Sequence, residues 1–242
     1  MLNVLTNLFV AAVLAGTPLL LGALGEILTE KAGNMNLGVE GMMFMGAITG
    51  LVSSYYYEQL VLNAGGTPSG FVSSVVALIT SFIAGAFGAL IYSFLTITLR
   101  ANQNVTGLTL TIFGTGFANF FGEFFAQKAG GYIAVTDVTK KAFVNLKIPV
   151  LSDIPVLGKL FFQYNWVVYF AILIAIAMMW FFAKSRVGLN LRAVGESPAT
   201  ADAAGIPIET YKYAATIIGG GICGIGGMYM SMVTTSGVWV HG

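Results

Sequence analysis

The feature that most constrains this chain is a series of six long, predominantly apolar runs. They cover residues 4–25, 38–57, 71–97, 105–126, 165–183 and 213–233. A helix needs about 20 such residues to cross the hydrocarbon layer of a bilayer, which is about 30 Å thick. Each run is therefore expected to form one transmembrane helix.

The composition indicates the same class of protein. Of the 242 residues, 57% are hydrophobic and 9% are charged, and the mean hydropathy is +0.84. Charged residues make up about 25% of a typical soluble domain, and a soluble fold could not cover its surface with so few. The predicted fold class is an all-α, polytopic membrane helical bundle of about six transmembrane helices, in a single transmembrane domain over residues 1–242.

Charge and missing motifs exclude several functions. The net charge of +1, without a cluster of basic residues, excludes a nucleic-acid partner. No G-x-x-x-x-G-K-[ST] loop is present, so the chain is not expected to hydrolyse ATP by that route. One cysteine, Cys223, and one histidine, His241, leave no metal site, and no pair of nucleophile and base is evident. No catalytic residue, metal or bound cofactor is therefore expected.

Two long connections, residues 127–164 and 184–212, are expected on opposite sides of the membrane because one predicted crossing separates them. The side of the 184–212 loop carries Lys31, Arg100, Lys184, Arg186, Arg192 and Lys212, and the other side carries Lys128, Lys140, Lys141, Lys147 and Lys159. Lysine and arginine are enriched in cytoplasmic loops. By a margin of one residue, this favours a cytoplasmic 184–212 loop and an external N-terminus.

A short helix with a start signal at one end and a stop signal at the other is predicted inside the 184–212 loop. Ser197 suits an N-cap, Pro198 suits the first helical position, and Gly205 suits the left-handed residue that ends a helix. Residues 199–204 between them favour helix. Such a helix could dock into a groove on a soluble partner. The alternative interpretation is an ordinary structured loop.

Three segments carry a resemblance to a known family. They are GLNLRAVGESPATADAAGIP at 188–207, GEILTEKAGNMNLGVEGMM at 25–43, and ANQNVTGLT at 101–109. They resemble the permease subunits of ABC importers for simple sugars and nucleosides, a ribose-type family that is similar to branched-chain amino acid permeases. The second segment is particularly similar to the nucleoside branch.

The resemblance implies partners and a role for the short helix. Residues 198–205 would form a cytoplasmic coupling helix that contacts a separate ATPase subunit. The residues expected to couple are Glu196, Ser197, Pro198, Ala199, Thr200, Asp202, Ala203 and Gly205. The implied partners are that ABC ATPase subunit, which would use the ATP, a substrate-binding lipoprotein or periplasmic protein, and a second permease subunit in a homo- or heterodimer. Family members usually continue with further membrane helices, so this chain is expected to be C-terminally shortened.

A first set of candidate pathway residues precedes the second apolar run. Asn34, Asn36 and Glu40 place two amides and a carboxylate where a helix should enter the hydrocarbon. Non-helical backbone at this depth survives only when it is buried in protein or faces water, and broken helices in transporters often lie beside the substrate route. Alternatively, Glu40 simply lies at the interface near a helix N-terminus, where a carboxylate is favourable.

A second set lies along the fourth run. Thr111, Thr115, Asn119 and Glu123 recur every four residues and so share one stripe of a helix, and Asn104 at its start is grouped with them. Phenylalanines occupy much of the remaining surface. Hydroxyl and amide groups beside aromatic rings suit a neutral, hydroxyl-bearing solute. Contacts between helices are the alternative role for the same polar groups.

Together these features predict a permease subunit of an ATP-driven ABC importer in the cytoplasmic membrane, which moves a nucleoside or a simple sugar. The alternative is an ion-coupled secondary transporter that uses Glu26, Glu40 or Glu123 as its protonatable group. A membrane-bound enzyme is a third class, and no catalytic constellation in the sequence supports it.

Overall fold

The structure is a computed structural model that describes residues 2–146 and 157–239, so Lys147 and His241 lie outside the described residues. The described residues form ten α-helices and two π-helical turns. In chain order these are α1 (Leu2–Glu30), α2 (Val39–Asn63), α3 (Gly70–Ser93), η1 (Phe94–Thr98), α4 (Gln103–Lys128), α5 (Asp137–Ala142), α6 (Leu157–Phe161), α7 (Trp166–Lys184), α8 (Arg186–Glu196), α9 (Pro198–Ala203), α10 (Ile208–Tyr229) and η2 (Met230–Thr234).

Each of the six predicted runs corresponds to one long helix, which confirms the all-α membrane bundle. In the part of the chain that the structure describes, four helices are long and apolar enough to cross a membrane: α1, α3 with η1, α7, and α10 with η2. The other two, α2 and α4, have 25 and 26 residues but are less apolar. Their lower hydropathy follows from hydroxyl, amide and tyrosine side chains, which need protein or water as neighbours.

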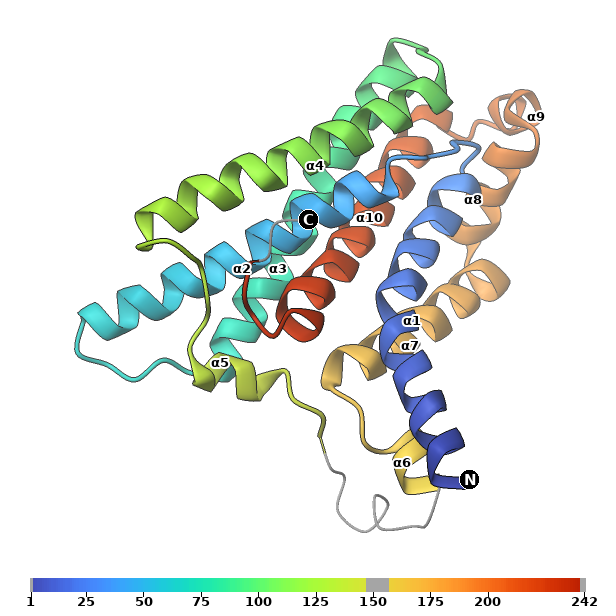
Figure 1. Cartoon of the computed structure of the whole chain (residues 1–242). Coiled ribbons are helices and arrows are strands. Elements are labelled where there is room, and N and C mark those ends of the chain that lie inside the picture. The colour runs from blue at the N-terminus through green and yellow to red at the C-terminus, as the bar shows by residue number, and fades with distance from the viewer. Residues whose placement is uncertain (1, 147–156, 240–242) are drawn as a thin grey trace.

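Helix α10 is the central helix and packs against α1, α2 and α3 (Figure 1). Its glycines let the backbones approach closely. A methyl group on Gly219 would overlap the carbonyl of Gly25 in α1, and one on Gly224 would overlap the carbonyl of Ser81 in α3. A methyl group on Gly227 would overlap the carbonyl of Met43 in α2. The glycine-rich run 219–227 is therefore a packing surface.

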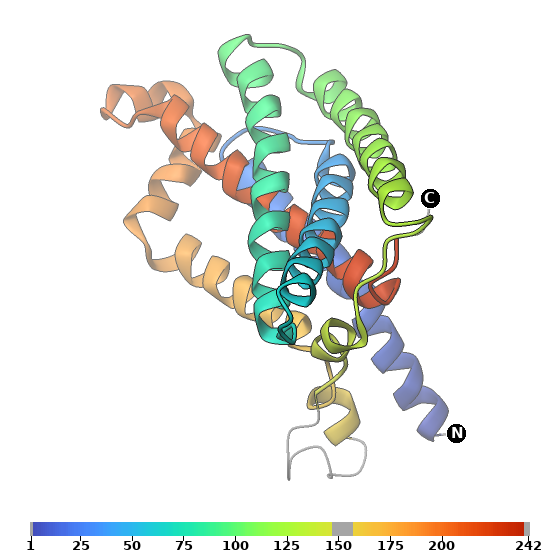
Figure 2. The ribbon, with the colours of Figure 1, turned by 90° about the vertical axis from the view of Figure 1, so that its left-hand side faces the viewer.

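Helix α2 lies between α3 and α4 and packs against both, whereas α3 and α4 contact each other in few places. Figure 2 shows α4 standing apart from α3, with α2 between them. At Gly114 the backbone of α4 meets that of Gly41 in α2, and at Gly107 it meets Leu37 just before α2. As a result, α3 and α4 pack on α2 side by side but remain largely separate from each other.

The two long connections lie at opposite ends of the bundle. The first contains α5 and α6, and the second contains α8 and α9 (Figure 1). The residues after η2 return to the first connection, where the backbone of Ala134 pairs with that of Val238. The Trp239 ring then packs against Gly122 near the end of α4.

Candidate functional site

The connection between α1 and α2, called here the 31–38 segment, is a non-helical stretch held by side chains from four helices. Asn34 is 1% exposed, and its side-chain carbonyl accepts a hydrogen bond from Gln103 Nε2 of α4 at 3.3 Å. Its amide nitrogen donates to Thr216 Oγ1 of α10 at 3.5 Å. The segment therefore connects α4 and α10, which are far apart in the sequence.

Asn36 connects the same segment to α1. Its backbone N–H donates to Glu26 Oε1 at 2.8 Å, and its side-chain carbonyl accepts from the N–H of Gly38 at 2.9 Å. Such an Asx turn supplies the backbone bonds that a helix would otherwise provide. The other carboxylate oxygen, Glu26 Oε2, is buried and has no hydrogen-bond partner among the described residues.

Further bonds fix the backbone of the 31–38 segment. The N–H of Met35 donates to Gln103 Oε1 at 2.9 Å, and the Tyr92 hydroxyl of α3 donates to the Met35 carbonyl. Thr111 Oγ1 of α4 donates to the Leu37 carbonyl at 3.0 Å. Buried backbone groups need such partners, so this broken connection is a built part of the fold.

Glu40, the third residue of the first predicted set, does not bond to the 31–38 segment in any contact given above. Glu40 is exposed in the first turn of α2, where a carboxylate interacts favourably with the helix dipole. This is the placement that the alternative interpretation expects. Its role in a pathway stays a prediction.

Helix α9 has the ends that the sequence predicts. Pro198 is its first residue, Ser197 is the N-cap, and Gly205 takes a φ of +76°. Gly205 N–H bonds to the Asp202 carbonyl at 2.8 Å, and Ile206 N–H bonds to the Ala201 carbonyl at 3.0 Å. These two bonds form a Schellman motif, which stops the helix at a left-handed residue.

The surface of α9 is open over most of its length. Ala201 is buried at 2% exposure and attaches the helix to the bundle. The predicted coupling residues are all exposed: Glu196, Ser197, Pro198, Ala199, Thr200, Asp202, Ala203 and Gly205. The backbone is therefore fixed while most side chains remain free to contact another molecule.

Helix α8, just before α9, is absent from the predictions. Ser185 caps it by accepting a bond from Gly188 N–H at 2.8 Å, and its buried residues Gly188, Leu191 and Val194 recur every three positions. That spacing in the sequence is the signal from which α8 could have been predicted. Near its end, a methyl group on Gly195 would overlap the Lys31 carbonyl, so α8 lies directly on the start of the 31–38 segment.

A groove of about 530 Å³ opens between α2, α3 and α4. Its lining residues are Met45, Ile48, Thr49, Val52 and Ser53 from α2, Thr80, Ile83, Ala84 and Phe87 from α3, and Phe117, Phe121 and Phe125 from α4. None of them is charged. The wall contributed by α4 is a ladder of rings, with 4.5 Å between the centroids of Phe117 and Phe121.

Hydroxyl groups provide the polar part of this groove. Thr49 Oγ1 donates to the Met45 carbonyl at 2.7 Å, and Thr80 Oγ1 donates to the Val76 carbonyl at 2.8 Å. Ser53 Oγ lies 2.7 Å from Thr80 Oγ1. Because these hydroxyls are bonded within the protein, they add almost no polar surface to the groove. The groove therefore presents an almost entirely apolar, largely aromatic surface.

The second predicted set lies outside the lining of this groove. Thr111 and Thr115 are half-buried and donate to backbone carbonyls, Thr111 across to Leu37 and Thr115 within α4. Asn119 is half-buried and Glu123 is exposed further along the same stripe. Asn104 is exposed in the first turn of α4, where Asn102 is the residue that caps the helix. On α4 the groove is thus lined by the phenylalanine face and not by this stripe, whose role in a pathway stays a prediction.

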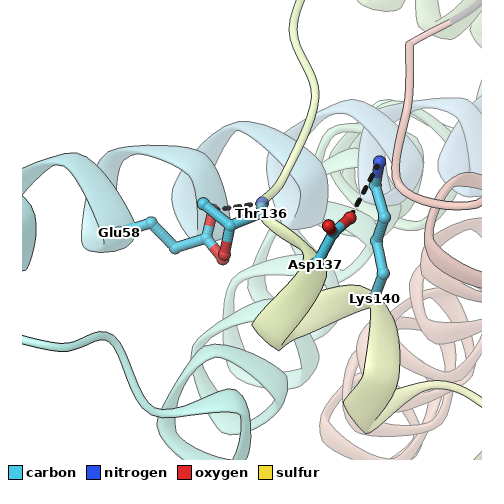
Figure 3. A network of polar contacts seen from close by, with 4 residues as sticks. All are labelled: Glu58, Thr136, Asp137 and Lys140. Atoms are coloured by element: carbon cyan, nitrogen blue, oxygen red, sulfur yellow. Dashed lines mark hydrogen bonds and ion pairs between the residues drawn. The ribbon is translucent and has the colours of Figure 1, made fainter.

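A second feature that the sequence did not indicate is a buried contact at the end of the bundle opposite to α8 and α9. Glu58, near the end of α2, is 0% exposed and accepts from the backbone N–H of Thr136 at 2.8 Å and from Thr136 Oγ1 at 2.6 Å (Figure 3). Thr136 is the N-cap of α5. The carboxylate of Glu58 therefore attaches the connection containing α5 to the bundle.

The fold and this site define a multi-pass permease component of the cell membrane. The chain belongs to the family described as "Branched-chain amino acid transport system / permease component", whose profile matches residues 8–240. The three segments that carry the family resemblance meet in space, because Gln103 of the third bonds to the second and Gly195 of the first lies against it.

Curated relatives cover almost the whole chain. It is 36% identical over 237 residues to a putative glucose ABC transporter permease protein of Haloferax volcanii, 34% over 236 residues to a guanosine ABC transporter permease protein of Bacillus subtilis, and 31% over 229 residues to a nucleoside ABC transporter permease protein of Lactococcus lactis. The alignments include 96%, 96% and 93% of this chain but 64%, 69% and 67% of these relatives, so the chain spans about two thirds of their length. No solved structure matches the chain significantly.

Proposed function

We propose that this chain is the membrane-spanning part of an ATP-driven ABC importer that moves a small, neutral, hydroxylated solute, either a nucleoside or a simple sugar. The supporting observation is the exposed α9, which is fixed by its Schellman motif and joined through α8 to the 31–38 segment. The relatives named for glucose, guanosine and nucleosides support the solute class. The uncharged groove with its phenylalanine rings offers a surface on which the apolar face of such a solute can stack.

In this proposal the energy comes from another subunit. A separate ATPase binds α9 on the cytoplasmic side and uses the ATP, while this chain binds no cofactor and has no ATPase site of its own. A binding protein, either a lipoprotein or a periplasmic protein, delivers the solute from outside, and a second permease subunit completes the pathway as a homo- or heterodimer. Movement of α9 then shifts the balance between conformations in which the solute is accessible from one side or the other.

Substitution on α9 tests the proposal. Ala203→Asp combined with Ala204→Asp places two charges at exposed positions, so neither new side chain has to be buried in the bundle. Like-charge or unpaired charges at a protein interface cost several kcal/mol, so we expect solute uptake into proteoliposomes with the ATPase to fall by about tenfold or more. ATP turnover is expected to lose its dependence on solute, and the melting temperature is expected to stay unchanged.

Ala64→Asp is the matched control, because Ala64 is an exposed alanine at the opposite end of the bundle. Its uptake should equal that of the parent. Unchanged uptake in the α9 double variant would exclude α9 as the coupling helix.

The alternative, an ion-coupled transporter, is favoured by one observation, the unpartnered carboxylate oxygen of Glu26. It predicts that a protonophore abolishes uptake and that ATP depletion does not. The ABC proposal predicts the opposite pair of results in the same vesicles.

A further inference from the structure

The end of α8 and the start of the 31–38 segment are in direct backbone contact. A methyl group on Gly195 would overlap the Lys31 carbonyl, and one on Gly33 would lie 3.2 Å from the Gly195 Cα. Gly33 also has a φ of +79°, which other residues rarely adopt. No flexible side chain separates the two backbones here. A displacement of α8 and α9 must therefore move the residues around Gly33.

Gln103 carries such a displacement from the segment to α4. It is the first residue of α4, and its side chain bonds twice to the segment, at the Met35 N–H and at Asn34 Oδ1. Two bonds from one planar amide fix both its position and its orientation. Gln103 therefore attaches the beginning of α4 to the residues that α8 contacts.

Helix α4 packs along α2, and their backbones approach most closely a little further along from Gln103. A methyl group on Gly41 would overlap the Leu110 carbonyl, and one on Gly114 would overlap the Gly41 carbonyl. The two backbones meet through glycine here, with the buried Leu110 side chain beside them, so this contact is a fixed point on which α4 can tilt. Gln103 lies on one side of the contact, and the groove wall of Phe117, Phe121 and Phe125 lies on the other.

The opposite wall of the groove does not hold α4 in place. Helix α3 packs closely on α2 and α10 but meets α4 in few places. A smaller hollow of about 200 Å³, lined by residues such as Tyr92 and Phe113, separates α3 from α4 nearer to Gln103. Tilting α4 on α2 therefore changes the width of the groove without breaking a packed interface between α3 and α4.

We propose that Gln103 is a positioning residue that converts movement of α8 and α9 into a tilt of α4 on the Gly41–Gly114 contact, and that this tilt opens and closes the groove. The proposal rests on the proposed function only in that the ATPase supplies the movement of α9. It assigns the transmitting contact within this chain, which the function itself does not require.

Cysteine labelling tests the relay. Cys223 is the only cysteine in the sequence and is buried, so a single Ser53→Cys substitution reports on the groove. The chain is assembled with the ATPase, and the rate of labelling by a water-soluble maleimide is measured with and without a non-hydrolysable ATP analogue. We expect nucleotide to change this rate by about tenfold, as a two-state shift of moderate size would. Gln103→Leu removes both bonds and should abolish the change.

Two further variants grade the effect. Gln103→Glu keeps an acceptor for the Met35 N–H and loses the donor to Asn34, so a partial response is expected. It also serves if Gln103→Leu fails to fold, which the melting temperature reports. Gln127→Leu is the matched control, because Gln127 is an exposed glutamine near the other end of α4. Its response should equal that of the parent.

A second reporter separates this inference from the proposed function. Ala203→Cys on α9 is cross-linked to the ATPase in each Gln103 variant. Absence of the cross-link in the parent would contradict the proposed function. A retained cross-link together with an unchanged labelling response in Gln103→Leu and Gln103→Glu, or with no nucleotide response in the parent, would overturn the relay alone.

Discussion

Single buried polar residues fix the connections between the helices of this protein. Asn34, Asn36 and Glu58 are all nearly inaccessible, and each has hydrogen bonds to a segment distant in the sequence or to a turn. In a chain with so much apolar surface, such bonds specify which segments meet, because apolar packing alone discriminates weakly between similar arrangements. Removing one partner leaves the other buried without a bond.

The contact between Glu58 and Thr136 leads to a prediction about local stability. Glu58→Ala removes the acceptor of both Thr136 bonds, which should destabilise the α5 connection by about 2 kcal/mol. Because Lys140 and Lys141 lie in α5, trypsin should then cleave there about tenfold faster or more. Limited proteolysis followed by mass spectrometry measures this rate.

Gln59→Ala is the control for that experiment, since Gln59 adjoins Glu58 and is not fully buried. Cleavage in the control should match the parent. Equal cleavage in Glu58→Ala and the parent would show that the carboxylate does not hold α5.

Among the helices, α4 has three surfaces with different compositions. Gly114 meets α2, Ala118 is buried one turn further along, and the phenylalanine ladder faces the groove. The stripe from Thr111 to Glu123 lies on the other side of the small-residue face and is partly exposed. Polar groups at membrane depth are costly towards lipid, which makes this stripe the part of α4 where contact with further protein or with solute is expected. Its role in the pathway stays a prediction.

Glycine packing around α10 leads to a prediction at the same scale. Gly224→Ala places a methyl group onto the Ser81 carbonyl of α3, and α10 cannot move away because it also touches α1 and α2. We expect a loss of stability of about 1–3 kcal/mol, the usual range for overpacking. The melting temperature of the purified protein in detergent measures it.

Gly116→Ala in α4 is the matched comparison, because nothing lies within 4 Å of the added methyl group. This variant should melt at the same or a slightly higher temperature, since alanine favours helix over glycine. If the two variants melted alike, close packing at Gly224 would not be the source of stability.

At the scale of the whole molecule, the arrangement separates two working regions. Helices α8 and α9 and the 31–38 segment lie at one end (Figures 1 and 2). The groove lies between α2, α3 and α4. The densely packed unit of α1, α3 and α10 with α2 provides the fixed part. Helix α4 is attached to this unit mainly along α2, so a movement of α4 disturbs mainly that one contact.

The groove leads to a prediction about uptake. Ala84→Phe places a ring from α3 into the space opposite the phenylalanine ladder. Because the ring occupies volume that a solute would need, uptake in proteoliposomes should fall by about tenfold or more, with little change in melting temperature. Ile79→Phe, on an exposed face of α3, is the control and should transport normally. Normal uptake in Ala84→Phe would place the solute outside this groove.

Much of this protein is determined by its sequence alone. The six runs predict the six long helices, because the need to satisfy backbone groups in a membrane leaves helix as the stable form for an apolar run. Pro198 marks the start of α9 and Gly205 marks its end, and both are predicted equally well from the sequence. The fixed φ of proline and the positive φ available to glycine are local properties of these residues. The position of α8 escaped prediction, although the spacing of Gly188, Leu191 and Val194 encodes it.

The tertiary structure decided the rest. The sequence shows that α4 has a polar stripe and a phenylalanine-rich surface, but which of them lines the groove depends on how α4 is rotated against α2, and the glycines at that contact set the rotation. Likewise, Glu58 and Thr136, or Gln103 and Asn34, are unremarkable until folding brings them together across 78 and 69 residues. Helical periodicity is a local property of the chain, whereas the choice of partner arises from packing between helices, which no single segment encodes.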